Sequence, residues 1–386
     1  MSNPFEGLRP ALEAIAEEAN VLPATGQALE DLMRPDHAEV IDRLRGGDDD
    51  KAMDVLLEAP NRKPYVVVQA LHRTQKHLLR FFLDGSARTF FLGDAVEGRR
   101  RTPVHVAQVG AAAVFRQDDG QVKVARSVNK IILMLDKKAV SFGDKVEALV
   151  LKAGPRFGFH DTMEEDGETE KSSPGKEPRS RAAHKAHHIM AGEEERLGRD
   201  LERGAGQWLV LDGSLGKDLY SWRDVPQFMG VTKSFSREPL FKLPGARGGQ
   251  VINLYELLAN LPFSARTCAF SARSGKVVVW YVRLREQRYL DYPLMGVVKI
   301  ELPNPTGNAV LSDVVDEISG AVVAERQVTP HGKDIRWHAH LYAIYLAEQA
   351  VKTGFVSTEA LKAGIRWPTQ AGGAVMRLRK ETANGS

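Results

Sequence analysis

The sequence predicts an α/β protein in which a mixed sheet is flanked by helices and preceded by a helical N-terminal extension. Three observations predict this class. Apolar residues recur at helix spacing near the N-terminus, short β-rich runs alternate with turn residues from Pro64 onward, and helical periodicity returns in the last third of the chain. We therefore divide the chain into an extension, residues 1–62, and one α/β domain, residues 63–386.

The extension is predicted to be helical from Pro10 to Leu57, because Leu12, Ile15 and Ala19 recur on one side and acidic residues on the other. The residues that follow it are rich in β-branched and aromatic side chains, which favour strands. The strands expected in this part are Tyr65–Leu71, His77–Leu83, Arg88–Leu92 and Val104–Phe115.

A polar segment, Asp161–Ser180, interrupts this pattern. It combines a run of acidic residues with Lys171–Pro178, and so has almost no apolar surface to offset the entropy of ordering. We expect a disordered insertion that can be shortened with little loss of stability. Beyond it the predicted strands are Gln207–Asp212, Met229–Ser234, Thr267–Ala272, Val277–Leu284 and Gly296–Leu302. The predicted helices are Arg181–Arg203, Ser312–Val323, Ile335–Thr353 and Thr358–Ala363.

Composition excludes several classes of protein. The 53 Lys and Arg nearly balance the 50 Asp and Glu, for a net charge of +3, so overall charge does not argue for nucleic acid. Cys268 is the only cysteine, which excludes an intrachain disulfide and a thiolate metal cluster. No apolar stretch approaches the roughly 20 residues that span a bilayer, and the N-terminus lacks the pattern of a secretory signal. We therefore expect a cytoplasmic protein with no membrane partner.

The most informative motif is Asp-Gly-Ser, which occurs at Asp84–Ser86 and again at Asp212–Ser214, each time directly after apolar strand residues. In an α/β sheet, ligand chemistry collects at the carboxyl ends of strands, and the small Gly-Ser pair leaves room for a metal or a phosphate. A single copy is most simply a turn dipeptide that ends a strand. Two copies after two strands favour a site built on both aspartates.

A hard divalent cation takes oxygen ligands from separate chain segments, so two aspartates call for a third carboxylate. The predicted helix before the second aspartate carries Glu193, Glu194 and Glu195. On a helical wheel Glu194 lies about 40° from the centre of the apolar face, Glu193 about 60° away on the other side and Glu195 about 140° away. Glu194 therefore points most nearly inward, whereas a solvated helix face is the simpler interpretation of the other two.

Two later segments add candidate polar groups. Lys233 ends the short apolar strand that begins at Met229, where a lysine either clamps a phosphate as a point charge or lies exposed. The late helix carries His338, His340 and Glu348. A histidine and a carboxylate there could complete a metal site or position water, although capping or surface histidines are equally common.

In this order the motifs resemble those of the NurA nucleases, prokaryotic enzymes that process DNA ends. Members of that family show two strands that end in Asp-Gly-Ser, a glutamate on a helix between them, a Gly-Val-x-Lys strand, a Tyr-x-Arg-Leu strand and a C-terminal helix with a polar ligand. The resemblance extends over roughly Lys63 to Phe355. The matching segments are Leu83–Ser86, Glu194, Leu211–Leu215, Gly230–Ser234, Tyr281–Leu284 and the region from His340 to Glu348.

The resemblance implies a ribonuclease-H-like (PIWI-like) fold for residues 63–386, a homodimer, and hydrolysis of single- and double-stranded DNA that depends on Mn²⁺ or Mg²⁺. It also implies a HerA-type hexameric ATPase as partner, in DNA end processing or anti-phage defence. The catalytic residues would be Asp84, Glu194, Asp212, Lys233 and His340. The metal ligands would be Asp84, Glu194, Asp212 and Glu348.

Two assignments stay open at this point. The acidic insertion lengthens the interval between the two aspartates, so Glu193 and Glu195 remain alternatives to Glu194. The late-helix role can fall to either His340 or Glu348, because the histidines lie earlier in the chain than the family pattern places them.

Other functions also place an aspartate at a strand end. An actin-like kinase is one, and an aspartate-nucleophile phosphatase is another, but the phosphatase pattern has a second aspartate two residues on, where this chain has Ser86 and Ser214. A catalytically decayed DNA-binding or adaptor subunit is the non-enzymatic alternative, against which the presence of Asp84, Asp212 and Lys233 counts. A metal-dependence assay on single-stranded DNA separates these functions.

Overall fold

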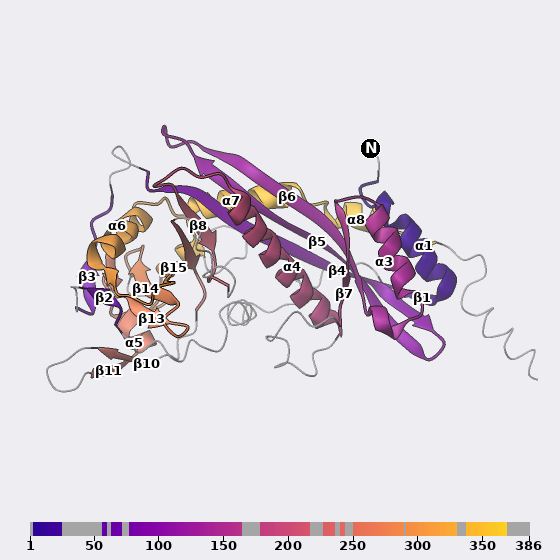
Figure 1. The fold of residues 1–386 in the computed structure, drawn as a ribbon, viewed down its shortest axis with the longest axis horizontal. Helices are drawn as coiled ribbons and strands as arrows, with labels where there is room; N and C mark the ends of the chain where they lie inside the picture. The colour runs from indigo at the N-terminus through magenta and orange to yellow at the C-terminus, as the bar shows by residue number, and fades with distance from the viewer. Residues whose placement is uncertain are drawn as a thin grey trace, which may run out of the picture.

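A mixed sheet of 12 strands organises the part of the chain that the computed structural model describes. This part comprises residues 3–24, 56–59, 63–71, 77–163, 178–216, 227–235, 240–243, 250–288, 291–329 and 337–368. Helices lie against the sheet along the elongated molecule (Figure 1). The predicted α/β class is confirmed.

The strands along the sheet are β3 (Tyr65–Val67), β12 (Ala265–Thr267), β14 (Val277–Arg283), β15 (Val297–Pro303), β9 (Phe228–Thr232), β8 (Trp208–Asp212), β4 (Leu79–Glu97), β5 (Arg100–Arg116), β6 (Val122–Leu135) and β7 (Phe157–Asp161). β1 (Asn20–Pro23) pairs with β4, and β13 (Phe270–Ala272) pairs with β14. Two small sheets join β10 (Leu240–Leu243) to β11 (Gln250–Asn253) and β16 (Val310–Leu311) to β2 (Glu58–Ala59).

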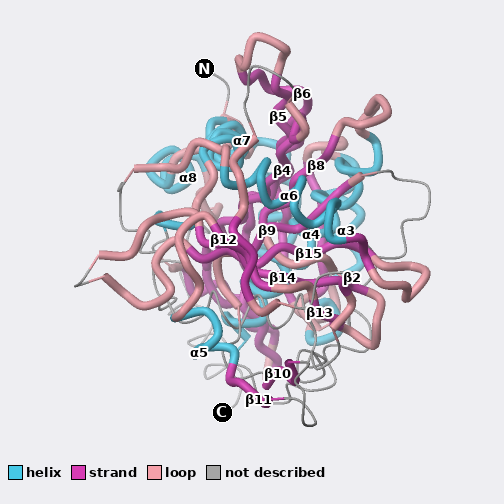
Figure 2. The backbone as a smooth tube through the Cα atoms, turned by 90° about the vertical axis from the view of Figure 1, so that its left-hand side faces the viewer, coloured by secondary structure: helices cyan, strands magenta, loops and turns pink. Residues whose placement is uncertain are grey.

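The helices are α1 (Arg9–Glu18), α3 (Gly143–Lys152), α4 (Pro178–Asp200), α5 (Leu254–Ala259), α6 (Ser312–Val323), α7 (Tyr342–Thr353) and α8 (Thr358–Gly364). Short 3-10 turns are η1 (Glu6–Leu8), η4 (Lys137–Ala139) and η7 (Trp337–Ala339). In Figure 1, α4 runs diagonally across the long strands, and α1 and α3 lie side by side at one end. Figure 2 looks onto the other end, where β9, β12, β14 and β15 gather and α5 lies beside β10 and β11.

The centre of the sheet joins an antiparallel meander to parallel strands. β4, β5 and β6 are consecutive and antiparallel, and Gly98, with a φ of +58°, forms the tight turn between the first two. β8 then pairs parallel to β4, and β9 pairs parallel to β8. Parallel strands end at the same edge, so the residues that follow β4 pairing and β8 are brought together.

Alternation along β4 separates two faces of the sheet. Phe81 and Leu83 pack with Leu197 of α4, whereas Phe82 packs with Ile344 and Ala347 of α7. α4 and α7 therefore cover opposite faces, and each residue of the central strands faces one helix or the other.

The predicted helical extension is only partly helical. α1 is a helix, and its apolar residues pack with α3 and the far end of β4 in one buried cluster. Asn20–Pro23, however, forms strand β1, which pairs antiparallel with β4 from Val96 to Gly93. The helical interpretation is wrong there, because an edge of β4 is free for pairing, and tertiary hydrogen bonding overrides local periodicity. Residues 25–55 lie outside the described residues.

The predicted insertion is also shorter at both ends. Asp161 is the last residue of β7, is buried, and accepts hydrogen bonds from the backbone N–H groups of Lys137 and Met163. Pro178–Ser180 already belong to α4. Residues 164–177 lie outside the described residues, so the prediction of disorder remains a prediction for them.

Several other elements differ from the expectation. β4 is one continuous strand, whereas two were predicted, and β6, α3 and β7 were not predicted at all. The predicted strand Thr267–Ala272 is divided between β12 and β13. His338 and His340 lie in and after η7, before α7 begins, and not within the late helix. Among the described residues, no helix combines the length and apolar character required to cross a membrane.

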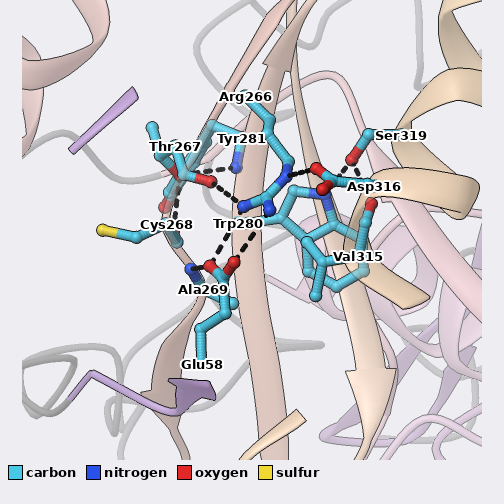
Figure 3. Close-up of polar contacts among 10 residues, drawn as sticks. All are labelled: Glu58, Arg266, Thr267, Cys268, Ala269, Trp280, Tyr281, Val315, Asp316 and Ser319. Atoms are coloured by element: carbon cyan, nitrogen blue, oxygen red, sulfur yellow. Dashed lines mark hydrogen bonds and ion pairs between the residues drawn. The ribbon is translucent and has the colours of Figure 1, made fainter. Parts of the chain in front are cut away.

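A buried polar cluster joins β2, β12 and α6 (Figure 3). Arg266 Nη2 and Nη1 lie 2.8 Å and 3.0 Å from the two carboxylate oxygens of Glu58, and its Nε lies 2.6 Å from Asp316 Oδ1. Glu58 also accepts a hydrogen bond from the backbone of Ala269 at 2.9 Å. The side chains of Arg266 and Glu58 are fully buried, so this pair fixes the short strand β2 against the sheet.

Candidate metal centre

The two Asp-Gly-Ser motifs meet where the parallel pairing of β4 and β8 ends. Leu83 and Leu211 form the last pair of that ladder, and Asp84 and Asp212 follow them. Because side chains alternate, both aspartates face α7, the opposite face to Leu83 and Leu211. β4 continues through Asp84 while β8 ends at Asp212, so the prediction of a strand end is wrong for the first motif and confirmed for the second.

Asp84, His340 and Glu348 form the closest group of possible metal ligands in the described residues. One ligand atom from each lies within 4.8 Å of the other two. Asp84 is 6% exposed and His340 is 1% exposed, while the side chain of Glu348 is 25% exposed. The group therefore combines two carboxylates and an imidazole from separate segments of the chain.

The local structure of α7 explains how two of these side chains reach the sheet. Ile344 and Ala347 pack on the sheet, and Glu348 lies one turn after Ile344 on the same helix face. His340 precedes the helix, and its carbonyl accepts a hydrogen bond from Val328 N at 3.0 Å. The sequence left the late role to either His340 or Glu348, whereas the structure brings both to Asp84.

Glu194 approaches from the opposite helix at the one position of β4 that has no side chain. A Cβ placed on Gly85 would fall 2.5 Å from Glu194 Oε1 and 2.8 Å from Met190 Cγ. Glu194 is 9% exposed. The glycine of the first motif is thus required for the close approach of this carboxylate, and not for a turn.

The neighbouring glutamates have other partners. Glu193 lies 2.5 Å from both Lys130 Nζ and Arg196 Nη2, and these two cations outweigh the effect of burial and lower the pKa of Glu193. Glu195 pairs with Arg199 at 3.5 Å. Of the three glutamates, Glu194 is therefore the one directed at Gly85, as the helical wheel indicates.

Replacing Gly85 tests this arrangement. We expect Gly85→Ala to fold, because the displaced Glu194 carboxylate is the end of a flexible side chain, but to cleave its substrate about 10- to 100-fold more slowly if Glu194 acts in the site. Gly192→Ala is the matched control, since it lies on α4 beside Glu194 and its added methyl group meets no atom within 4 Å. Equal activity of Gly85→Ala and wild type would contradict a role for Glu194.

Lys233 follows β9 and pairs with the second aspartate. Its Nζ lies 2.8 Å from Asp212 Oδ2, and the side chains are 9% and 17% exposed. The lysine therefore stands at the end of its strand as predicted, beside the carboxylates and not in bulk solvent. Gly213, with a φ of +101°, turns the chain immediately after Asp212.

The charges around Asp84 make a strongly acidic environment. Burial, followed by Asp212, Glu348 and Glu194, raises the pKa of Asp84 well above its ordinary value, and Lys233 opposes this effect only in part. A carboxylate in such surroundings is stabilised by a divalent cation, which replaces repulsion among the acids with attraction. The donor types, carboxylate oxygens with one imidazole nitrogen, fit such a cation.

The predicted site residues are thus mostly brought together. Asp84, His340 and Glu348 are within ligand distance of one another, while Asp212 and Glu194 act on Asp84 electrostatically from just outside that group. The Tyr281–Leu284 segment is not part of the site. Arg283 is buried there and donates to backbone carbonyls such as those of Leu258 and Leu261, which gives it a structural role.

Comparison with known proteins adds no relative to this description. No protein-family model matches the chain, and no curated protein is significantly similar to it in sequence. The residues of the site are therefore the basis on which a function can be assigned.

Proposed function

We propose that this protein is a divalent-metal-dependent DNA nuclease of the NurA type. The observation that carries the proposal is the convergence of Asp84, His340 and Glu348 within 4.8 Å, beside Asp212 and Glu194. Carboxylates from separate segments that share one small buried volume are characteristic of metal-assisted phosphodiester hydrolysis.

The arrangement of the central strands supports a ribonuclease-H-like core. The meander β4–β5–β6 is followed in sequence by α4 and then by two strands parallel to β4, with the order β6–β5–β4–β8–β9 across the sheet. The acidic residues lie on the first strand of the meander, on the helix, on the first parallel strand and on the late helix α7. These are the positions that the resemblance to NurA nucleases implies.

The residues present fit Mn²⁺ better than Mg²⁺. Asp84, His340 and Glu348 would hold one ion, and Asp212 and Glu194 lie close enough to contribute to it or to a second. Mg²⁺ strongly prefers oxygen ligands, whereas Mn²⁺ also accepts an imidazole. When bound, such an ion acidifies water and stabilises the charge that develops on a phosphodiester.

The chain's own residues supply the rest of the chemistry. Lys233 places a positive charge beside Asp212, where it can pair with a phosphate oxygen and hold the substrate. The buried position of His340 fixes its ring against Asp84 and Glu348. The small residues Gly85 and Gly213 leave the approach to the carboxylates open at the backbone.

DNA as the substrate, dimerisation, and a HerA-type ATPase as partner belong to the same proposal and derive from the family resemblance. In this view the nuclease acts in DNA end processing or anti-phage defence together with a translocating ATPase. A catalytically inactive DNA-binding or adaptor subunit is the outcome that the following experiment would reveal instead.

The test uses the purified chain and end-labelled single- and double-stranded DNA, with Mn²⁺, Mg²⁺ or EDTA. We expect cleavage with Mn²⁺, slower cleavage with Mg²⁺, and none with EDTA. DNA binding without cleavage under every metal condition would contradict a nuclease and favour the adaptor function. Cleavage that persists in EDTA would contradict the metal site.

A further inference from the structure

A buried ion cluster lies behind the Asp212 turn, on the face of the sheet opposite α7. Glu301 alternates on β15 with Ile300, which packs in the core beneath α7, so Glu301 faces the other way. Its carboxylate lies 2.8 Å from Lys299 Nζ and 3.5 Å from Arg273 Nη2, and the three side chains are at most 3% exposed. None of the three belongs to the proposed metal centre.

The cluster holds the backbone of Leu215, the residue that follows Asp212-Gly213-Ser214. Leu215 N donates a hydrogen bond to Glu301 Oε2 at 2.8 Å, and Arg273 donates one to the carbonyl oxygen of Leu215. Both polar backbone groups of Leu215 therefore have charged partners, which make stronger hydrogen bonds than neutral ones. This fixes the end of the turn.

The start of the same turn is fixed against β9. Gly213 N donates to Val231 O at 2.9 Å, and Ser214 Oγ lies 3.3 Å from Thr232 Oγ1. The turn that carries Asp212 is thus held at both ends, by β9 on one side and by the Glu301 cluster on the other. Its position relative to β4 depends on these contacts.

Stability alone is a weak reason for such a cluster. A buried ion pair often stabilises a fold no more than apolar residues of the same volume do. What a carboxylate provides here, and an apolar side chain does not, is an acceptor for the N–H of Leu215. Burial acts to raise the pKa of Glu301, but Lys299 and Arg273 outweigh it and hold that pKa below the ordinary value, so the acceptor stays ionised.

We propose that Glu301 is a positioning residue for the metal centre, which holds Leu215 so that the Asp212 carboxylate stays beside Asp84 and Lys233. The inference rests on the proposed function, in which Asp212 contributes to metal binding. Groups that orient a metal ligand without touching the metal typically change metal affinity or activity by about 10- to 100-fold when they are altered.

The experiment compares two isosteric variants, Glu301→Gln and Glu58→Gln. Glu58 is a matched control, because it is also a buried carboxylate that accepts a backbone N–H, from Ala269, and pairs with a buried arginine. It does not contact the Asp212 turn. Three quantities are measured on folded protein: Mn²⁺ affinity by electron paramagnetic resonance, hydrogen exchange of the Leu215 amide without metal, and kcat and KM for DNA cleavage.

We expect Glu301→Gln to weaken Mn²⁺ affinity and lower kcat by about tenfold or more, with little change in KM, and to speed exchange at Leu215. Glu58→Gln should leave all three within about twofold of wild type, since distant sites act independently. Wild-type Mn²⁺ affinity and Leu215 exchange in Glu301→Gln would overturn the inference. A wild-type chain that binds no Mn²⁺ would instead contradict the proposed function, and Leu215 exchange would still report on Glu301.

A second pair of variants keeps the test decisive if Glu301→Gln does not fold. Lys299→Met removes the ammonium that competes for the glutamine oxygen, so Lys299→Met/Glu301→Gln and Lys299→Met/Glu301→Leu differ only in the acceptor for Leu215. We expect the glutamine member of the pair to bind Mn²⁺ severalfold more tightly. Equal affinity of the two double variants would show that Glu301 does not position Asp212.

Discussion

Asp84→Asn is expected to lower the rate of DNA cleavage by about a hundredfold or more while the protein stays folded. Asp84 is the residue common to every acidic contact in the site, because it lies within 4.8 Å of His340 and Glu348 and is affected electrostatically by Asp212 and Glu194. An uncharged amide binds a divalent cation far more weakly than a carboxylate. Cleavage rates at saturating Mn²⁺ and Mn²⁺ affinity are the measurements.

The same substitution should stabilise the metal-free protein. Burial and neighbouring acids raise the folded pKa of Asp84 above its ordinary value of 3.8, so its ionised form costs folding free energy at any pH above that value. Asn removes this cost, and its advantage over wild type should therefore grow as the pH rises above about 4. Thermal unfolding without metal, at several pH values, measures this difference.

Glu195→Gln is the control for both measurements. Glu195 is on the same helix as Glu194 but pairs with Arg199 on the exposed side, so its loss should leave cleavage and stability near wild type. The assignment of Asp84 would be wrong if Asp84→Asn kept more than a few percent of the wild-type rate.

Arg266→Met is expected to produce the largest loss of stability, about 3–5 kcal/mol, because it leaves Glu58 buried without its cationic partner. Both side chains are fully buried, and the pair is bidentate at 2.8 Å and 3.0 Å (Figure 3). The free energy of unfolding from urea denaturation is the measurement. A loss below about 1 kcal/mol would mean that water or a backbone shift solvates Glu58.

The effect should depend on pH in a defined direction. In wild type, burial acts to raise the pKa of Glu58, but the hydrogen bonds and charge of Arg266 lower it below its ordinary value of 4.5. Glu58 therefore contributes stability above that pH, and this contribution is lost as the pH falls through the folded pKa. The gap between wild type and Arg266→Met should narrow in acid for the same reason.

A double variant separates charge from packing. Glu58→Leu/Arg266→Met removes both buried charges, so it should be more stable than Arg266→Met alone. It should not reach wild type, because Ala269 N then loses its acceptor, at a cost of about 1–3 kcal/mol. A double variant less stable than the single one would contradict this account.

The regions that the sequence analysis missed have a common physical cause. The first half of β6 is mostly exposed, so its apolar and polar residues do not alternate as they do in a half-buried strand. β1 is a strand because it completes an edge of β4, a contact between residues some seventy positions apart that local periodicity does not encode. Propensity and spacing describe neighbours in sequence, whereas pairing depends on neighbours in space.

The sequence by itself determined the α/β class, the helix Ser312–Val323 at its observed bounds, and the candidate residues Asp84, Glu194, Asp212, Lys233, His340 and Glu348. It could do so because strand-end aspartates and helical spacing are local patterns. Only the tertiary structure decided how these residues are used. It placed both His340 and Glu348 on Asp84, directed Glu194 to the space left by Gly85, and set Glu301 behind the Asp212 turn. Those relations depend on which faces of the sheet α4, α7 and β15 meet, and side-chain packing across the whole core determines that.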